Sequence, residues 1–290
     1  MGCGSFSASS YASYSTARGR TFDSVTCSLT DNVSSHEMFT QRRLHEQLDV
    51  KNKIRECCDN AEHPNTVPVI LALDVTGSMG DAAVKVAKSL GCIMKEIYEE
   101  TKDVEFSIMA IGDIECDMVP IQMSQFESDI RIAEALDNVY FEYGGGGNGW
   151  ESYSLAWYTG LKHARLDCWK RGKKGIIITL GDEPLNPYIM LNGASTSLKE
   201  CLGDNEQAKI DTKDLYELAS EKYDIYHISV TDSGSYYYRK DRIDSSFKEV
   251  LPKENYFVAC INELPGVISK IINEAAASPA QLFDGKEITW

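Results

Sequence analysis

Short apolar runs and longer amphipathic stretches alternate along the chain from residue 65 onward. The run over residues 69–75 is almost continuously apolar, which is typical of a strand that is buried on both faces of a sheet. The stretches between such runs carry apolar residues at helical spacing. This alternation predicts an α/β fold in which helices flank a doubly wound, mostly parallel central sheet.

The expected elements follow from these patterns. Strands are predicted at residues 69–75, 104–111, 175–180, 225–231 and 256–260. Helices are predicted at residues 81–99, 125–136, 150–169, 212–222, 242–251 and 264–276. In open sheets of this kind, ligands bind beyond the carboxyl ends of the strands. The loops that follow the strands at 69–75 and 175–180 are therefore the first places to look for a site.

The first 63 residues have a different pattern. Residues 1–35 are rich in Ser, Thr, Gly and Tyr, and we expect a flexible arm there. Ser34 and Glu37 match a capping box, which predicts a charged helix over 36–58 within a helical extension at 36–63. This helix either packs beside the sheet or presents a face to a partner. Residues 64–277 then form the α/β domain, and 278–290 form a tail.

The strand at 69–75 runs directly into three oxygen-bearing side chains at alternate positions, Asp74, Thr76 and Ser78. One carboxylate and two hydroxyls suit a hard divalent cation such as Mg²⁺. Because hydroxyls add no negative charge, the cation would keep positive charge and open positions for an outside carboxylate or phosphate. The same residues also fit an ordinary capped turn between a strand and a helix.

Two further segments could complete such a site. The predicted strand at 175–180 is followed by Asp182 and Glu183. Upstream, the glycine-rich run Y-G-G-G-G-N-G-W-E-S-Y over 143–153 contains Asn148 and Glu151 and leads into a predicted helix. A bare glycine run is also consistent with a flexible linker. Here, however, it lies between two predicted strands.

These three motifs resemble the metal-ion-dependent adhesion site (MIDAS) of von Willebrand factor type A (VWA) domains. The D-x-T-x-S run matches the family's D-x-[ST]-x-S signature, and Asp182 matches the aspartate after the family's fourth strand. The glycine run is similar to the G-G-G-[DN]-x-x-E loop of intracellular members. It lacks the metal-binding Thr of integrin-like members, so Asn148 or Glu151 is left to complete a variant site.

The resemblance covers roughly residues 64–277 and implies a Rossmann-like VWA fold with a bound Mg²⁺ (or Mn²⁺). The implied metal ligands are Asp74, Thr76, Ser78, Asn148 and Asp182. By the same resemblance, the chain is expected to bind a protein partner whose carboxylate completes the metal's coordination sphere. It would act as an adaptor in a multiprotein assembly and not as an enzyme.

Two loops should open on the same face as the motifs, one over 183–211 and one over 232–240. Tyrosine and arginine are enriched among the residues that dominate binding at protein interfaces. Candidate ligand-binding residues are Glu183, Tyr188, Tyr236, Tyr237, Tyr238 and Arg239. The tyrosines could instead merely cover the edge of the sheet.

The composition of the chain restricts the classes of partner and the cellular compartment that we expect. The net charge of −15 argues against a binder of duplex nucleic acid and against docking on anionic membranes. No apolar run approaches the length of a membrane span. The nine cysteines are scattered and form no C-x-x-C pair, so neither a zinc site nor a disulfide framework is expected. Free thiols and the absence of an apolar core in residues 1–20 predict a cytoplasmic protein.

The main alternative function is a metal-dependent hydrolase that uses Asp74, Asp182 and Glu183 around an activated water. It is disfavoured because no histidine lies near the three motifs; His163 and His227 fall within a predicted helix and a predicted strand. RNA binding, which some proteins with a VWA domain carry out, has the least support because the chain is acidic.

Overall fold

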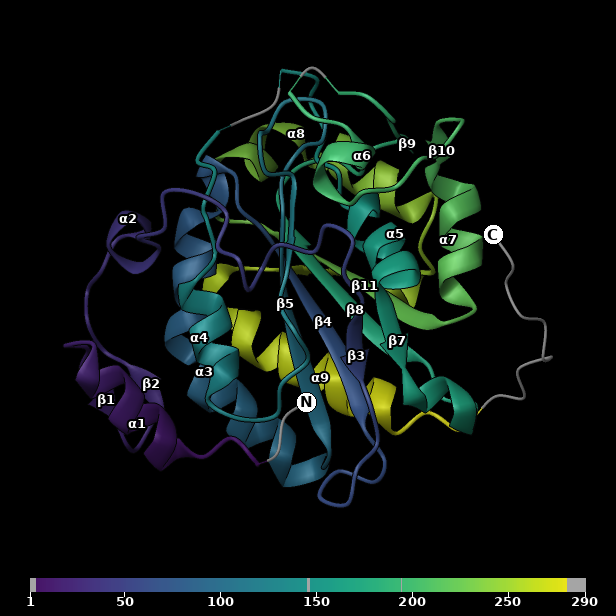
Figure 1. Cartoon of the computed structure of the whole chain (residues 1–290). Helices are drawn as coiled ribbons and strands as arrows, with labels where there is room; N and C mark the ends of the chain where they lie inside the picture. Colours follow the sequence, from purple (N-terminus) through teal and green to yellow (C-terminus); the bar gives the residue numbers. More distant parts are fainter. Residues whose placement is uncertain (1–3, 145–146, 194, 281–290) are drawn as a thin grey trace.

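The centre of the molecule is a six-stranded sheet with the strand order β12-β11-β8-β4-β5-β6 (Figure 1). The computed structural model describes residues 4–144, 147–193 and 195–280. The strands of the sheet are β4 (Val67–Asp74), β5 (Val104–Ile111), β6 (Ile121–Met123), β8 (Gly175–Gly181), β11 (Tyr223–Val230) and β12 (Tyr256–Ala259). All neighbours run parallel except β6, which is antiparallel to β5. The predicted α/β class with a mostly parallel sheet is confirmed.

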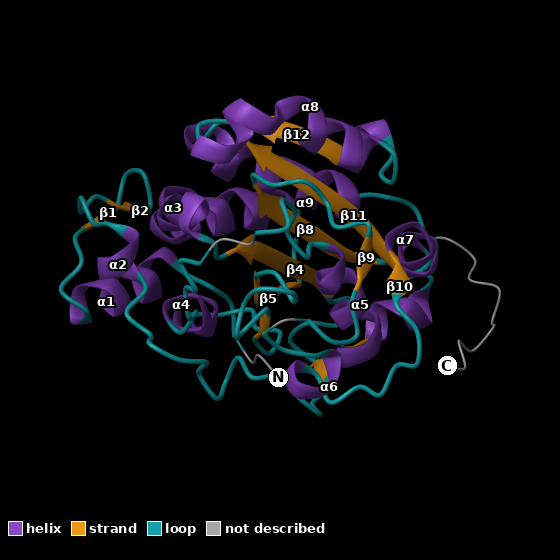
Figure 2. Ribbon diagram, turned by 90° about the horizontal axis from the view of Figure 1, so that it is seen from above, coloured by secondary structure: helices purple, strands orange, loops and turns teal. Residues whose placement is uncertain are grey.

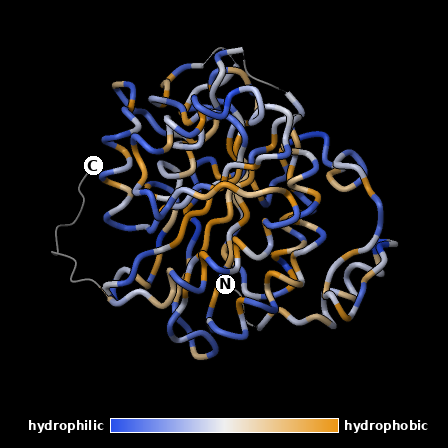
Figure 3. Tube along the Cα trace, turned by 180° about the vertical axis from the view of Figure 1, so that it is seen from behind, coloured by the Kyte–Doolittle hydropathy of each residue, from blue (hydrophilic) through white to orange (hydrophobic). Residues whose placement is uncertain are grey.

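Helices cover both faces of this sheet (Figure 2). One face is covered by α3 (Gly80–Glu100), α4 (Arg131–Asp137) and α9 (Leu264–Ala276). The other is covered by α5 (Ser154–His163), α7 (Thr212–Ser220) and α8 (Gly234–Lys248). Side chains of β4 alternate between the two cores: Leu71 faces the first and Ile70 the second. Because both faces are covered, the central strands β4 and β8 are apolar at nearly every position, and hydrophobic colouring is concentrated in the middle of the molecule in Figure 3.

The order of the strands creates a crevice at the carboxyl ends of β4 and β8. From β4 the chain passes through α3 to β5 and β6 at one edge of the sheet, and later returns to form β8, β11 and β12 on the other side. The loops that follow β4 and β8 therefore lead away in opposite directions. Such a switch point is where ligands bind in open α/β sheets.

The N-terminal segment is more ordered than the predicted flexible arm. It contains α1 (Ala8–Ala17) and a hairpin of β1 (Phe22–Asp23) and β2 (Ser28–Leu29). The hydroxyl of Tyr11 donates to the carbonyl of Ala87 in α3 (2.8 Å), and the Tyr11 ring is buried. A Cβ at Gly91 of α3 would lie 2.3 Å from the carbonyl oxygen of Cys27. Glycine at that position therefore allows the hairpin to lie against α3.

The predicted helix over 36–58 is wrong. The capping box exists, since the Ser34 N–H donates to the Glu37 carboxylate (2.8 Å), but the helix α2 (Ser35–Met38) ends after one turn. The chain then runs irregularly, and its Leu48 carbonyl accepts the N–H of Met123 in β6 (2.8 Å). An edge strand offers unpaired backbone groups that extended chain can bond and a helix cannot. This explains why the segment covers the sheet edge in a non-helical form.

Other boundaries also differ from prediction. The helix predicted over 150–169 is only α5, followed by β7 (Ala164–Leu166), which pairs in parallel with β3 (Arg55–Cys57), and by the 3₁₀ helix η2 (Asp167–Arg171). Helix α4 begins later than predicted, and α8 begins earlier, at Gly234. The remaining short elements are η1 (Gly77–Met79), β9 (Tyr188–Ile189), α6 (Leu198–Cys201), β10 (Ile210–Asp211), η3 (Lys253–Asn255) and η4 (Ile261–Glu263). Residues 281–290 of the predicted tail, residues 145–146 of the glycine run and residue 194 lie outside the described residues.

Two helical glycines provide a test of this packing. Gly91→Ala should lower the free energy of unfolding by about 1–3 kcal/mol, because the methyl group would collide with the hairpin. Gly266→Ala in α9 is the matched control, since nothing lies within 4 Å of the Cβ position there. That variant should be unchanged or slightly more stable. Urea denaturation measures both values, and equal stability of the two variants would contradict the packing of the hairpin on α3.

Candidate metal-binding cleft

Asp74, the last residue of β4, is completely buried. Its Oδ1 accepts the N–H of Thr76 (2.8 Å) and the Thr76 hydroxyl (2.6 Å). Its Oδ2 accepts the hydroxyl of Tyr153 (2.7 Å). The carboxylate thus ends the strand by holding the next turn, which leads through η1 into α3.

Tyr153 was missed by the sequence analysis. It lies just before α5, and its buried hydroxyl links the ends of two strands, because it donates to Asp74 and accepts the N–H of Glu183 (3.3 Å). A Cβ at Gly181, the last residue of β8, would lie 1.9 Å from the Tyr153 hydroxyl oxygen. Glycine is therefore required there. A glycine that ends an apolar strand was the only sequence signal for this close approach.

The second motif meets the first as predicted. The Ser78 hydroxyl donates to Asp182 Oδ1 (3.0 Å), and the Asp182 side chain is buried. Asp182 Oδ2 is also buried and accepts no well-formed hydrogen bond from the described residues, although the Ser233 hydroxyl and the Ser235 N–H are close enough to the carboxylate to lower its pKa. An unpaired buried carboxylate oxygen is costly unless a cation or an ordered water satisfies it.

The glycine run is joined to the same place through its backbone. The N–H of Tyr143 donates to the carbonyl of Val75 (3.3 Å), and the N–H of Gly77 donates to the carbonyl of Gly144 (3.2 Å). Further along, Glu151 forms an isolated parallel bridge with Leu185, beyond the end of β8. The three motifs, although far apart in the sequence, therefore converge at the carboxyl ends of β4 and β8.

Of the two candidates in the glycine run, Glu151 lies at the site and Asn148 is turned elsewhere. The Asn148 amide donates to Asp113 Oδ2 (2.6 Å), and its carbonyl oxygen accepts the N–H of Trp150 (3.3 Å). The Glu151 side chain lines the cleft between the motifs. Its Oε2 is buried and has no hydrogen-bond partner among the described residues. Glu151 is thus better placed than Asn148 to approach an ion.

A cleft of about 280 Å³ opens between these loops. Its described lining residues are Thr76, Gly77, Ser78, Tyr143, Gly144, Gly149, Trp150, Glu151, Glu183, Ser235 and Arg239. Asp74 and Asp182 lie buried behind the two hydroxyls that are bonded to them. At the rim, Arg239 Nη1 donates to Glu183 Oε2 (2.5 Å).

Crowded carboxyl groups dominate the electrostatics of the cleft. Burial raises the pKa of Asp74, and the nearby charge of Asp182 raises it further. Burial also raises the pKa of Asp182, partly offset by the Ser78 hydroxyl, and raises that of Glu151 well above its usual range. Each of these shifts means that negative charge is costly here. A bound cation would reverse that cost.

The donor set fits a hard divalent cation held largely through hydroxyls and water. None of the described lining residues is His or Cys. Among the described residues, no three His, Cys, Asp or Glu side chains are grouped closely enough to hold a metal by themselves. An ion would therefore depend on Thr76 and Ser78 as well as the carboxylates. Such oxygen-only donors suit Mg²⁺ or Mn²⁺.

The predicted ligand-binding residues separate into different environments. The expected loop over 232–240 is largely the start of α8, on which Ser235 and Arg239 face the cleft. Tyr236 belongs to the core, because it is buried and its hydroxyl donates to Asp244 (3.0 Å), so its assignment as a ligand-binding residue is wrong. Tyr237 and Tyr238 are 81% and 84% exposed. Tyr188 lies in β9 against Trp150 (6.2 Å between ring centroids).

The two histidines that bear on the hydrolase alternative lie among packed side chains. His227 is fully buried and stacks on Phe247 (3.6 Å between centroids), and burial lowers its pKa well below 6.5. His163 bonds the Lys53 carbonyl and Asp204. The cysteines of the described part are all free. None of the helices in the described ranges combines the length and the apolar character that crossing a membrane requires.

Comparisons with known proteins find distant similarities to solved structures. No protein-family model matches the chain, and no curated protein matches it. A structure of the pilus adhesin SpaC from Lactobacillus rhamnosus GG is 13% identical with a TM-score of 0.49, and the match covers 78% of this chain and 32% of the adhesin. The chain thus spans about a third of that adhesin's length.

A smaller structure is matched over almost its whole length. The vWF domain of the type V pili tip protein Mfa5 from Porphyromonas gingivalis is 11% identical with a TM-score of 0.46. The match covers 76% of this chain and 98% of that domain. At these identities and TM-scores, the likeness does not establish the family of this chain.

The hydroxyl of Tyr153, which links Asp74 to the backbone of Glu183, can be tested by removing its oxygen. Tyr153→Phe should lower the free energy of unfolding in EDTA by about 1–3 kcal/mol, because it leaves Asp74 Oδ2 buried without its donor. Tyr158→Phe, within α5, is the matched control, because the hydroxyl lost there bonds the half-buried Asp204 and Glu206. Its loss should be smaller. A Tyr153→Phe protein as stable as the unmodified chain in urea would show that Tyr153 does not support Asp74.

Proposed function

We propose that this chain is a VWA-type binding module that holds Mg²⁺ (or Mn²⁺) in the cleft and recognises a protein partner through that ion. The observation that carries the proposal is the meeting of Asp74 and Asp182, both buried, with two hydroxyls at an open cleft. The buried Oδ2 of Asp182, which accepts no well-formed hydrogen bond from the described residues, supports the need for a cation.

The ion would be held by Thr76, Ser78, Asp74 and Asp182. Glu151 would complete the site, a role that the sequence left open between Asn148 and Glu151. A hydroxyl can donate its proton to a carboxylate and still offer lone pairs to a cation. The bonds from Thr76 to Asp74 and from Ser78 to Asp182 are therefore compatible with metal binding by the same hydroxyls. The bound ion supplies a Lewis-acidic position for an outside carboxylate.

The rim of the cleft supplies contacts for a protein ligand. Arg239 is 44% exposed and lines the cleft, so it can reach an acidic group of the partner as well as Glu183. Tyr237 and Tyr238 lie beside it in the sequence, and their rings meet edge to face (5.2 Å between centroids). Exposed aromatic rings of this kind give large contact area at low entropic cost. The ligand best suited to this surface is an Asp or Glu side chain on another protein.

An adaptor role in a multiprotein assembly inside the cell is part of the same proposal. The alternative, a metal-dependent hydrolase, has less support because Glu183 is already paired with Arg239. The described lining of the cleft also contains no His to move a proton. Recognition of a partner through the ion requires neither an unpaired Glu183 nor a His.

Metal binding can be tested by thermal denaturation. Asp74→Ala and Asp182→Ala should each abolish the rise in melting temperature that Mg²⁺ causes, because each removes one of the buried charges that attract the ion. Asn148→Ala is the matched truncation and should retain most of the response, since its amide is bonded to Asp113. Far-ultraviolet circular dichroism checks the fold of each variant. An unchanged Mg²⁺ response in Asp74→Ala would overturn the site.

Partner recognition can be tested by a pull-down from the native cell. A partner bound through the ion should be lost in EDTA and recovered with Mg²⁺ or Mn²⁺. Tyr237→Ala and Tyr238→Ala together should weaken binding at least about tenfold without loss of folding, because both rings are exposed. A double change at two other exposed positions, Leu218→Ala and Val258→Ala, is the control. Equal recovery in EDTA and on the Asp74→Ala protein would show that another surface binds the partner.

A further inference from the structure

A second and larger cleft lies at the opposite end of the sheet, where β4, β8 and β11 begin. Its volume is about 360 Å³, near the lower end of the range of about 300–1,000 Å³ that is typical of small-molecule sites. It is bounded by the start of these strands, by η2 and by the end of α9. None of the described residues that line it also lines the metal-binding cleft.

One part of this cleft is apolar. Val67 of β4, Ile176 of β8 and Ala275 of α9 contribute aliphatic groups to the lining. Cys168 adds a buried thiol, and burial raises its pKa to about 12, so it is uncharged at neutral pH. A neutral buried thiol behaves as a small apolar group. This part of the cleft therefore favours an apolar ligand body.

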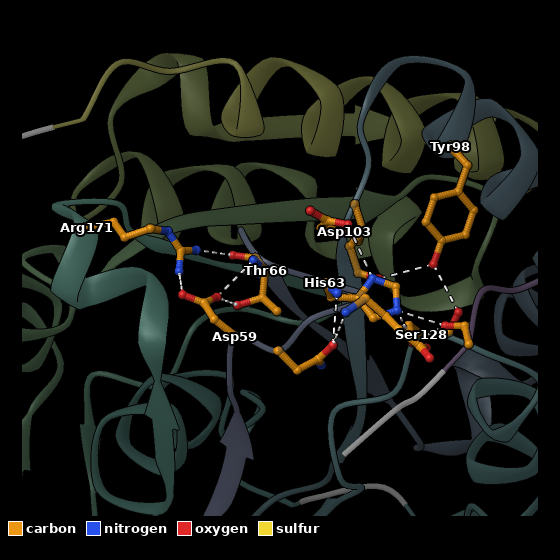
Figure 4. A network of polar contacts seen from close by, with 11 residues as sticks. Asp59, His63, Thr66, Tyr98, Asp103, Ser128 and Arg171 are labelled. Carbon is orange, nitrogen blue, oxygen red and sulfur yellow. Dashed lines mark hydrogen bonds and ion pairs between the residues drawn. The ribbon is translucent and has the colours of Figure 1, made fainter.

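The positive charge of the lining comes from three side chains, Arg171, Lys173 and Lys174. Arg171 is fixed in place: its guanidinium donates to the Asp59 carboxylate and to the Thr66 carbonyl (2.7 Å), as Figure 4 shows. Asp59 in turn accepts the Thr66 hydroxyl (2.8 Å). A guanidinium carries further N–H donors besides the two in these bonds, and such a fixed fork recognises anions well.

The two lysines are held less tightly. Lys173 Nζ donates to the carbonyl of Ser278, and Lys174 Nζ lies 3.8 Å from Asp224 Oδ1. Asp224 is the only carboxylate among the described lining residues, and burial raises its pKa although Lys174 opposes this shift. Three cations thus share one lining carboxylate, while Asp59 behind the lining bonds Arg171. This is a local excess of positive charge on a chain whose net charge is −15.

We propose that this cleft binds a small organic anion with an apolar body, such as an aliphatic carboxylate. The anionic head group would lie among Arg171, Lys173 and Lys174, and the body would lie against Val67, Ile176 and Ala275. The two kinds of surface face one space, so a ligand needs both parts to use it fully. The inference does not depend on the metal-binding cleft, which lies at the other end of the strands.

The head-group requirement is tested with three probes that share one body: octanoate, octanol and octylammonium. Titration calorimetry on the full chain should show saturable binding of octanoate, at least tenfold weaker binding of octanol, and no measurable binding of octylammonium. Inorganic phosphate tests the body, and should bind at least tenfold more weakly than octanoate. Octylammonium or phosphate that binds as tightly as octanoate would overturn the proposed ligand class.

Variants then locate the site. Lys173→Gln with Lys174→Gln should weaken octanoate at least tenfold, whereas Lys199→Gln with Lys240→Gln changes the net charge equally at exposed positions outside the cleft lining and should have no effect. Ala276→Phe places a ring in the cleft without changing charge, and should weaken octanoate and octanol alike. Unaltered octanoate binding in both cleft variants would overturn the site. The Mg²⁺-dependent melting shift should persist in all of them, which separates this test from that of the proposed function.

Discussion

The burial of two carboxyl groups at the ends of adjacent strands is the constraint on which the cleft depends. Asp74 and Asp182 are both fully enclosed, and the charge of Asp182 raises the pKa of Asp74. Buried like charges are unfavourable unless donors or cations compensate them. Much of the surrounding structure supplies such compensation: the backbone and hydroxyl of Thr76, the hydroxyl of Ser78 and the hydroxyl of Tyr153.

Compensation by neutral donors is incomplete, and the proposed binding of a cation in the cleft rests on this deficit. Asp182 Oδ2 and Glu151 Oε2 are buried and accept no well-formed hydrogen bond from the described residues. A divalent cation would satisfy several such oxygens at once, and it would remain attractive to an outside carboxylate because hydroxyls do not neutralise it. The electrostatic cost of the site and its proposed capacity to bind a cation thus arise from the same excess of negative charge.

The two ends of the parallel sheet differ in charge. The carboxyl end gathers Asp74, Glu151, Asp182 and Glu183, with Arg239 at the rim, whereas the amino end gathers Arg171, Lys173 and Lys174 around Asp224. Helices cover both faces of the sheet and leave its strand ends to the connecting loops (Figure 2). Polar and charged groups can therefore collect there without disturbing the apolar core. The acidic end suits a cation, and the basic end suits an anion.

The sequence by itself determined the central strands, their parallel arrangement and the convergence of the D-x-T-x-S run with Asp182. A strand that is covered on both faces is mostly apolar, and parallel strands bring their carboxyl ends together, so these features can be read from local pattern and order. The bounds of β5 and α9 were predicted to the residue.

Only the tertiary structure decided the partners of individual side chains. In the folded chain Asn148 bonds Asp113, and Tyr236 is buried. The Tyr153 hydroxyl lies against Gly181 and donates to Asp74. The N-terminal segment packs on α3. In place of the expected helix over 36–58, an irregular segment bonds the edge strand of the sheet. Local pattern reports whether a residue prefers to be buried, but which group it meets depends on segments far away in the sequence. Those contacts are fixed by the space left between packed elements and by the need to satisfy each buried polar atom.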